Sequence, residues 1–126
     1  MKTVIEKIML LPISFLAACG NKNQQVKDFI PGAYVNHVQS AYSIADDTLQ
    51  IIGDAATGNN YRISRETGFI RIISGKLQPK EQQVKQLNGL WDMQKQILQI
   101  IQNGIILIFQ PGDHKLVIQN SGYRKL

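Results

Sequence analysis

The sequence predicts an all-β protein: a single antiparallel meander of about 8–9 short strands, arranged as a small barrel, a half-barrel or a curled sheet. Turn-forming residues interrupt the chain at short intervals from Pro31-Gly32 to Ser121-Gly122, so no helix of about 12 residues fits comfortably between them. The segments between these turns alternate in polarity or are rich in isoleucine, valine and tyrosine, which favour strands.

The expected strands fill the intervals between the turns. They cover residues 33–39, 47–53, 60–65, 68–74, 80–92, 96–102, 105–110, 115–119 and 122–126. Asp46 and Asp47 are expected to end one element and to begin the strand that follows. Apolar residues between 80 and 100 also fit helical spacing, and we assign this segment to strand.

Asn103-Gly104 is the clearest local turn motif, because Asn-Gly accepts positive φ at both central positions of a type I′ turn. This turn would pair Gln102 with Ile105, Ile100 with Leu107, and Leu98 with Phe109 on a core-facing side. The opposite side would then present Ile101, Ile106 and Ile108. Since both sides are apolar, we expect the chain to cover the hairpin on both sides, or these three isoleucines to contact a partner.

The first residues predict a lipoprotein signal peptide over residues 1–18. Lys2 and Lys7 lie in a basic region that precedes a short apolar run from Ile8 to Phe15. The run is too short to span a bilayer, which takes about 20 apolar residues. Export and removal of this segment are therefore expected.

The segment Leu16-Ala17-Ala18-Cys19 resembles the bacterial lipobox. The resemblance implies cleavage before Cys19 and attachment of lipid to this cysteine. Cys19 is the only cysteine in the chain, so lipidation also accounts for a thiol that has no intramolecular disulfide partner in an exported protein. Several acyl chains on one residue hold a domain stably at a membrane.

Residues 19–28 are expected to form the lipidated cysteine and a polar tether, because residues 21–27 lack an apolar period. Residues 29–126 then form a single β domain, a size at which one core can bury about 60–70% of the unfolded surface. The chain has a formal net charge of +5, spread without long blocks. This charge favours mild attraction to anionic surfaces and indicates no particular ligand.

The chain offers no recognisable catalytic set, metal site or cofactor motif. His37 and His114 are the only histidines, and two histidines with scattered carboxylates do not supply the three or four ligands of a zinc site. Asp46 and Asp47 are adjacent, so in a strand they point to opposite faces. No serine lies in a Gly-x-Ser-x-Gly motif. We therefore expect no catalytic residues, no bound metal and no cofactor.

A series of basic residues with two aromatic neighbours raises the question of nucleic-acid binding. The series contains Arg62, Arg65, Arg71, Lys76, Lys80 and Lys85, with Tyr61 and Phe69 among them. Strand alternation places Arg62 on the face opposite to Tyr61 and Arg65, which splits the series, and Phe69 is expected in the core. A solvated sheet face is the simpler interpretation, and no nucleic-acid partner is expected.

Several segments of the mature chain resemble small lipoproteins encoded on conjugative transposons of Bacteroidota. They are Phe29-Ile30-Pro31-Gly32-Ala33-Tyr34-Val35, Tyr42-Ser43-Ile44-Ala45-Asp46-Asp47-Thr48-Leu49, Asn60-Tyr61-Arg62-Ile63, Phe109-Gln110-Pro111-Gly112 and Tyr123-Arg124-Lys125-Leu126. The resemblance implies a cellular setting and no catalytic residues. Surface display in that phylum is associated with acidic residues soon after the cysteine. Residues 20–24 contain none, which favours a periplasm-facing anchor in the outer membrane.

These observations favour a non-enzymatic lipoprotein that sits on the membrane through Cys19 and interacts with an envelope protein, as an accessory to a conjugative element or to envelope assembly. A small-ligand carrier with a lipocalin-like apolar cavity is the alternative. An enzyme or an enzyme inhibitor is a third possibility, and it would require carboxylates, histidine and a hydroxyl to converge in one cleft.

Overall fold

The computed structural model of the protein describes residues 22–54 and 58–126. The predicted signal peptide, its residues Leu16, Ala17 and Ala18, and the lipidation site Cys19 lie outside these ranges. The described elements are α3 (Lys22–Phe29), β1 (Gly32–Gln39), β2 (Ser43–Gly53), β3 (Asn60–Ile73), β4 (Lys76–Leu77), β5 (Glu81–Asp92), β6 (Ile97–Ile100), β7 (Ile106–Gln110), the 3-10 turn η1 (Pro111–Asp113), β8 (Lys115–Ile118) and β9 (Ser121–Lys125).

The strands form a closed antiparallel barrel, which confirms the predicted all-β meander. Each strand of the barrel pairs with its neighbour in the order β1, β2, β3, β5, β6, β7, β8 and β9. The ring closes because β9 pairs with β1, placing Lys125 opposite Tyr34. β4 is an additional short strand that pairs with the end of β3.

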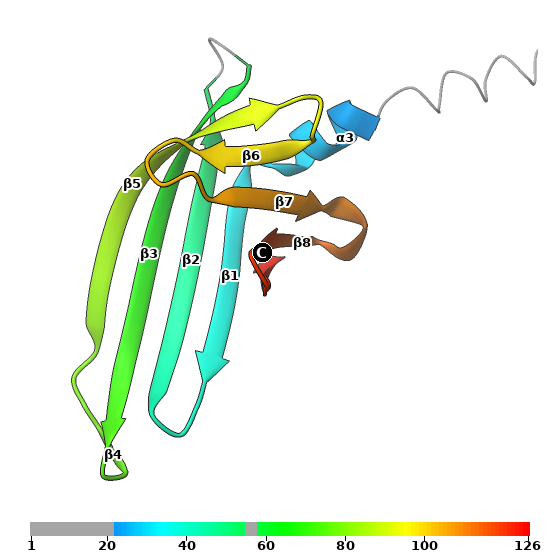
Figure 1. Cartoon of the computed structure of the whole chain (residues 1–126). Helices are drawn as coiled ribbons and strands as arrows, with labels where there is room; N and C mark the ends of the chain where they lie inside the picture. The colour runs from blue at the N-terminus through cyan, green and yellow to red at the C-terminus, as the bar shows by residue number, and fades with distance from the viewer. Residues whose placement is uncertain (1–21, 55–57) are drawn as a thin grey trace, which may run out of the picture.

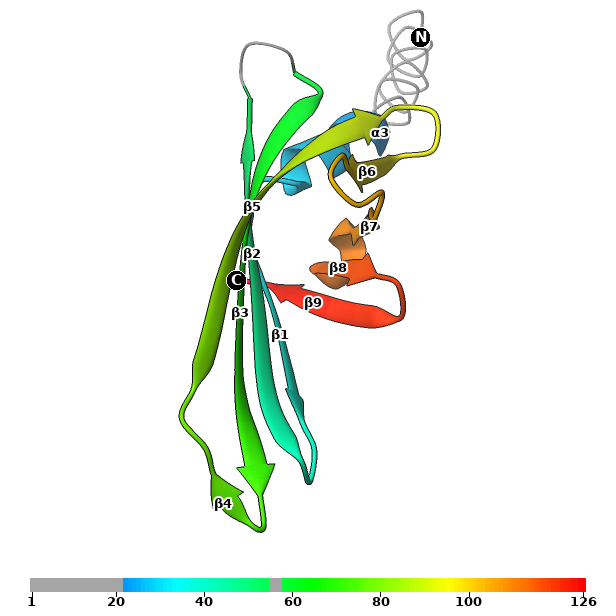
Figure 2. The same cartoon turned by 60° about the vertical axis from the view of Figure 1, so that its left-hand side comes forward.

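The strands on the two sides of the barrel differ greatly in length. β1, β2, β3 and β5 contain 8, 11, 14 and 12 residues, whereas β6 to β9 contain only 4 or 5. The short strands therefore face only one end of the long ones (Figures 1 and 2). We call the part completed by β6 to β9 the closed half. The open half comprises residues 36–39, 43–47, 65–73 and 81–86 of the long strands.

Buried apolar side chains fill the closed half. Fifteen described residues form this core: Ile30, Tyr34, Leu49, Ile51, Tyr61, Ile63, Leu87, Trp91, Leu98, Ile100, Leu107, Phe109, Leu116, Ile118 and Tyr123. They alternate along each strand with exposed or half-buried residues, as expected when one face of a strand points into a barrel. The predicted core positions Leu98, Ile100, Leu107 and Phe109 are all among them.

The expected tether differs from the structure, because Lys22–Phe29 forms the helix α3. The helix is held by its C-terminal end, where carbonyl groups lack helical partners. The Tyr34 hydroxyl lies 2.8 Å from the Phe29 carbonyl oxygen and 2.9 Å from that of Ile30. Lys125 Nζ also donates to the Phe29 carbonyl and lies over the Phe29 ring. Val26 and Phe29 pack against the core, so the helix covers the closed end of the barrel.

Two predicted strand boundaries are wrong. Asp46 and Asp47 lie inside β2, and the expected strands 60–65 and 68–74 form one continuous strand, β3. In both cases the chain is paired on both sides: Gly68 lies opposite Asp46 of β2 and Gln82 of β5. Two complete hydrogen-bond ladders outweigh the weak strand preference of glycine and aspartate. The assignment of 80–100 to strand rather than helix is correct, since β5 and β6 occupy it.

The type I′ turn predicted at Asn103-Gly104 is also wrong. Gly104 has φ +73°, but Asn103 is not among the residues with positive φ. Leu98 pairs with Leu107 and Gln99 with Ile106, a register two residues away from the predicted one. The Asn103 side chain accepts the Ile105 N–H (2.9 Å), which stabilises a longer loop. Because the shift is even, each residue keeps its predicted face.

The outer face of this hairpin is not covered by the described residues. Ile101, Ile106 and Ile108 are 63%, 42% and 44% exposed. For the described part of the chain, the expectation that both faces would be covered is therefore wrong, because the strands of the barrel enclose only the inner face of β6 and β7. Contact with a partner remains the other expectation for these residues.

A matched pair of glycine substitutions tests the packing of the closed half. A Cβ on Gly89 would lie 2.9 Å from Leu98 Cγ and 3.1 Å from Ile63 Cδ1, whereas one on Gly112 meets nothing within 4 Å. We expect Gly89→Ala to lower the free energy of unfolding by about 1–3 kcal/mol, the usual cost of overpacking. Gly112→Ala should leave it unchanged or slightly higher. Urea denaturation measures both, and equal effects would contradict the described packing.

Candidate functional site

The inner face of the open half is the candidate functional site. None of the short strands in the described part of the chain lies opposite it (Figure 2). A hollow of about 420 Å³ lies on this face where it meets β9. We call this inner face the trough; side chains lining its hollow include those of Asn36, Ser43, Ala45, Asp47, Thr67, Phe69 and Tyr123. Phe69 is thus half-buried in the trough rather than part of the core, contrary to expectation.

Asp47, Arg65 and Tyr123 form a bonded cluster at the boundary between the trough and the core; we call it the Asp47 cluster. Arg65 Nη2 donates to Asp47 Oδ2 at 2.6 Å, and Arg65 Nε lies 3.1 Å from both carboxylate oxygens. The Tyr123 hydroxyl donates to Asp47 Oδ2 at 2.6 Å. These bonds join β2, β3 and β9, and they fix the direction of the Arg65 side chain.

The environment of the Asp47 cluster keeps its tyrosine neutral and its arginine charged. Burial raises the pKa of Tyr123 to about 12, and the hydrogen bond to Asp47 adds to the effect. The hydrogen bond to Asp47 likewise raises the pKa of Arg65, against the opposing effect of burial. Because its pKa is raised, Tyr123 stays protonated near neutral pH and offers no phenolate to act as a base. The cluster therefore provides a fixed cation and hydrogen-bonding groups rather than a nucleophile.

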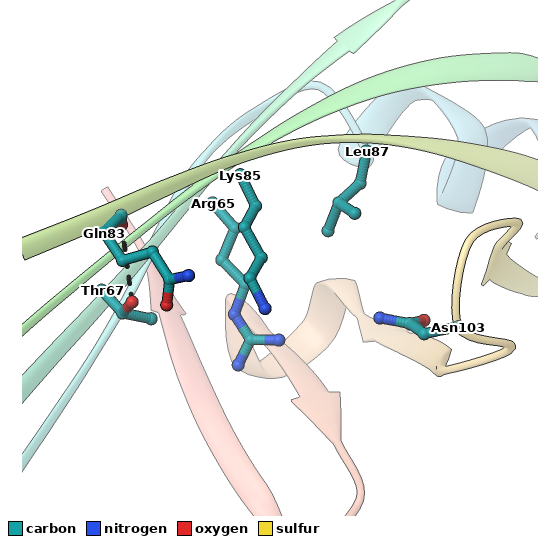
Figure 3. Close-up of a pocket in the computed structure, with 6 residues that line it drawn as sticks. All are labelled: Arg65, Thr67, Gln83, Lys85, Leu87 and Asn103. Carbon is teal, nitrogen blue, oxygen red and sulfur yellow. Dashed lines mark hydrogen bonds between the residues drawn. The ribbon is translucent and has the colours of Figure 1, made fainter.

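A second hollow of about 260 Å³ lies beside the cluster, between β3, β5 and the loop from β6 to β7. We call it the cationic cavity. Arg65, Thr67, Gln83, Lys85, Leu87 and Asn103 line it (Figure 3). Arg65 and Lys85 are directly opposed partners on β3 and β5, and both side chains point away from the sheet. The lining contains two cations and no acidic residue.

Three donors of the cationic cavity are free to bind a ligand. Lys85 makes no ion pair or hydrogen bond with the described residues, and the bonds that Arg65 forms with this part of the chain leave its Nη1 unused. Asn103 uses Oδ1 to accept the Ile105 N–H, so its amide nitrogen remains, and Figure 3 shows it turned into the cavity. Such a set of donors suits a carboxylate or another anion.

The trough is bordered by unpaired strand edges. On β5, the Trp91 N–H donates to the Asn59 carbonyl. Because the N–H and C=O groups of successive strand residues point to alternate sides, those of the odd-numbered residues of β5 face β3. The backbone groups of Gln82, Val84 and Gln86 therefore point to the other side, where the described residues supply no strand. On β1, the Leu126 N–H donates to the Ala33 carbonyl, so the backbone groups of His37 and Gln39 likewise point to the β9 side, beyond Val35, where the pairing between β1 and β9 ends.

The predicted partner surface lies on a different part of the molecule. Ile106 and Ile108 line a shallow hollow of about 470 Å³ on the outer face of the hairpin, together with Ile105 and Gln119. Ile101, which is also exposed, lies in the loop and does not line this hollow. The structure therefore brings together two of the three predicted residues.

The sequence drew attention to the residues of the trough for reasons other than binding at one site. Arg65 and Lys85 appeared as parts of a basic series, and Asp47 as the start of a strand. Strand alternation could have placed both cations on the inner face, because Arg65 follows Ile63 by two positions and Lys85 precedes Leu87 by two. The contact of Arg65 with Asp47 and Tyr123 could not be found this way, because it depends on the closure of the barrel.

The described residues provide no grouping of three or more potential metal ligands. His37 pairs with Asp46 on the outer face, and His114 lies in the turn after η1 with φ +51°. Within residues 22–54 and 58–126, no helix has the length and apolar character needed to cross a membrane.

Comparisons of the chain with protein-family models, with curated proteins and with solved structures find no match.

The raised pKa of Tyr123 predicts a loss of stability at alkaline pH. Its contribution is complete below the unfolded-state pKa of 10 and disappears as pH rises from 10 to about 12, because the unfolded chain releases the proton first. We expect the free energy of unfolding of the native protein to fall by about 2–3 kcal/mol more over this range than that of Tyr123→Phe. Tyr34 and Tyr61, whose pKa burial also raises, contribute to both proteins. Parallel urea-denaturation curves would contradict the assignment.

Proposed function

We propose that this protein is a non-enzymatic lipoprotein of the bacterial envelope that binds another envelope protein through the trough. The observation that carries this proposal is the uncovered inner face, bordered on β1 and β5 by unpaired backbone groups. An exposed sheet edge binds other polypeptides readily, and proteins without a use for it generally protect it. Here three consecutive edge-facing residues of β5 lack a partner among the described residues.

The place of Cys19 in the sequence, close to α3, supports a trough that faces away from the membrane. Lys22, the first residue of α3, follows Cys19 by three positions, and consecutive Cα atoms are about 3.8 Å apart. A lipidated Cys19 therefore lies within about 11 Å of the helix that covers the closed end. The open half extends from the opposite end of the barrel (Figure 1). Anchoring through Cys19 would direct the trough away from the membrane, toward proteins in the periplasm.

The packed interior favours an interaction protein over a carrier with a lipocalin-like cavity. Tyr34, Tyr61 and Trp91 are at most 5% exposed and occupy the volume where such a carrier would hold its ligand. The resemblance to lipoproteins of conjugative transposons supports a role as an accessory to such an element. The absence of acidic residues from 20–24 supports an anchor in the outer membrane that faces the periplasm.

Lipid attachment is tested by substituting the cysteine. We expect the native protein to fractionate with membranes and Cys19→Ser to lose both processing and membrane association, because only the thiol can receive the thioether lipid. Mass spectrometry of the mature N-terminus identifies the modified residue. Unchanged membrane association of Cys19→Ser would refute the lipoprotein assignment.

The binding face is tested by crosslinking in intact cells. A photoreactive amino acid replaces Val38 in the trough, Ile106 on the hairpin, or the exposed Arg62 on the outer face of β3 as a control. We expect a discrete adduct from position 38 and none from position 62, because only the trough contacts the partner.

Adducts from position 106 alone would instead place the interface on the hairpin surface of Ile101, Ile106 and Ile108. In that case Ile108→Ser, introduced into the protein that carries the photoreactive residue at position 106, should abolish the adduct without lowering thermal stability. No adduct from positions 38 and 106 would contradict the proposal that this is an interaction protein.

A further inference from the structure

We infer that the open edge of β5 binds an extended segment of the partner as an additional strand, and that an acidic side chain of this segment enters the cationic cavity. The inference rests on the proposed function of the trough and names the chemistry of its ligand. Two independent observations support it: the unpaired backbone of β5 and the unpaired cation of Lys85.

The edge of β5 can pair with an added strand over a short stretch. At Gln82, Val84 and Gln86, both the N–H donor and the C=O acceptor point outward in the plane of the sheet. The pairing between β5 and β6 ends at Asn88, two residues after Gln86. There the Ile101 N–H donates to the Asn88 carbonyl at 2.8 Å, and the Gln102 side chain accepts the Asn88 N–H at 3.0 Å. An added strand would continue the sheet from the point at which β6 leaves it.

The position of the cationic cavity predicts which residue of the added strand is acidic. Directly opposed residues on neighbouring strands share one face of a sheet. A residue opposite Lys85 would therefore lie in the same inward row as Lys85 and Arg65. In this position a glutamate or aspartate would meet the Lys85 ammonium first, with Arg65 Nη1 and the Asn103 amide nitrogen beside it. Its neighbours would lie opposite Val84 and Gln86 and form the backbone hydrogen bonds.

The charges of the cavity explain why an acid is favoured over a neutral residue. Without a ligand, Lys85 lies directly opposite Arg65, and like charges in this arrangement are unfavourable. Asp47 neutralises only one of the two. A single carboxylate would balance Lys85, and the cavity of about 260 Å³ has room for one acidic side chain rather than for a larger polyanion. Both cations point into the cavity, which favours a peptide carboxylate over a flat anionic membrane surface.

Another explanation for a charged residue at position 85 is that its inward-pointing cation prevents other polypeptides from pairing with the open edge of β5. This explanation predicts that peptides do not bind, and that removing the charge promotes association. The two explanations therefore give opposite results in one experiment.

The experiment measures peptide binding to the full lipidated protein in detergent, by fluorescence anisotropy. The probe is a blocked, labelled peptide in which threonine and valine alternate around one central glutamate, and its twin carries glutamine instead. We expect the glutamate peptide to bind about tenfold more tightly, the usual effect of a charge-assisted hydrogen bond in a partly exposed site. Lys85→Gln should remove this preference. Lys95→Gln, the same charge change in the exposed turn between β5 and β6, should preserve it.

The strand-addition part is tested with a second pair of variants. Val84→Pro removes an N–H from the open edge and should weaken both peptides at least tenfold, whereas Val84→Thr keeps this N–H and should bind normally. Thermal melts establish that both variants are folded. If Val84→Pro does not fold, N-methylation of the peptide residue opposite Val84 removes the other hydrogen bond of the same pair, which this residue would donate to the Val84 carbonyl, and it should weaken binding in the same way.

Equal binding of the two peptides would overturn the acidic specificity. Normal binding to Val84→Pro, or no binding of either peptide to the native protein, would overturn strand addition. These failures are distinguishable from failure of the proposed function, which would appear as absent crosslinks from both the trough and the hairpin in cells.

Discussion

The difference in length between two sets of strands is the constraint on which the rest of this structure depends. A strand advances about 3.3 Å per residue, so β3, with 14 residues, is roughly three times as long as β7, with 5. The short strands can complete a barrel over only part of that length. The closed half consequently has an interior to fill, and it is filled with apolar side chains. The open half has an inner face that no other described element opposes, and polar and charged groups are concentrated there.

The buried core and the exposed inner face are therefore separated along one sheet. At the closed end, Tyr34 and Lys125 bind the carbonyl groups at the end of α3, while Phe29, Tyr34 and Phe109 pack with ring centroids 5.8–6.4 Å apart. At the boundary, the Asp47 cluster links β9 to β2 and β3. Beyond it, the long strands are held by their ladders. Burial of the core thus supports a projecting surface that has little core of its own.

The two exposed surfaces differ in what they can recognise. The outer face of β6 and β7 offers isoleucine side chains on strands whose backbone groups are paired on both sides. Its contacts would be apolar and weakly directional. Among the described residues, the trough combines unpaired backbone groups with two cations, of which Arg65 is fixed by Asp47. A ligand there would therefore be selected both by its extended conformation and by its charge. This combination of directional contacts is the physical reason for assigning the principal binding role to the trough.

The sequence by itself determined the features that depend on local preference and on alternation. Turn residues and β-branched segments predicted the meander, and alternation predicted the inward positions of Leu98, Ile100, Leu107 and Phe109, which a register shift of two does not alter. The residues Leu16 to Cys19 predicted the lipid anchor, which remains a prediction. Only the tertiary structure decided that Gly68 continues a strand, that Asn103-Gly104 forms a longer loop, and that α3 closes the barrel. It also brought Asp47 to Tyr123, 76 residues away. These features depend on pairing partners distant in the sequence, whose combined hydrogen bonds and burial outweigh the preference of any single residue.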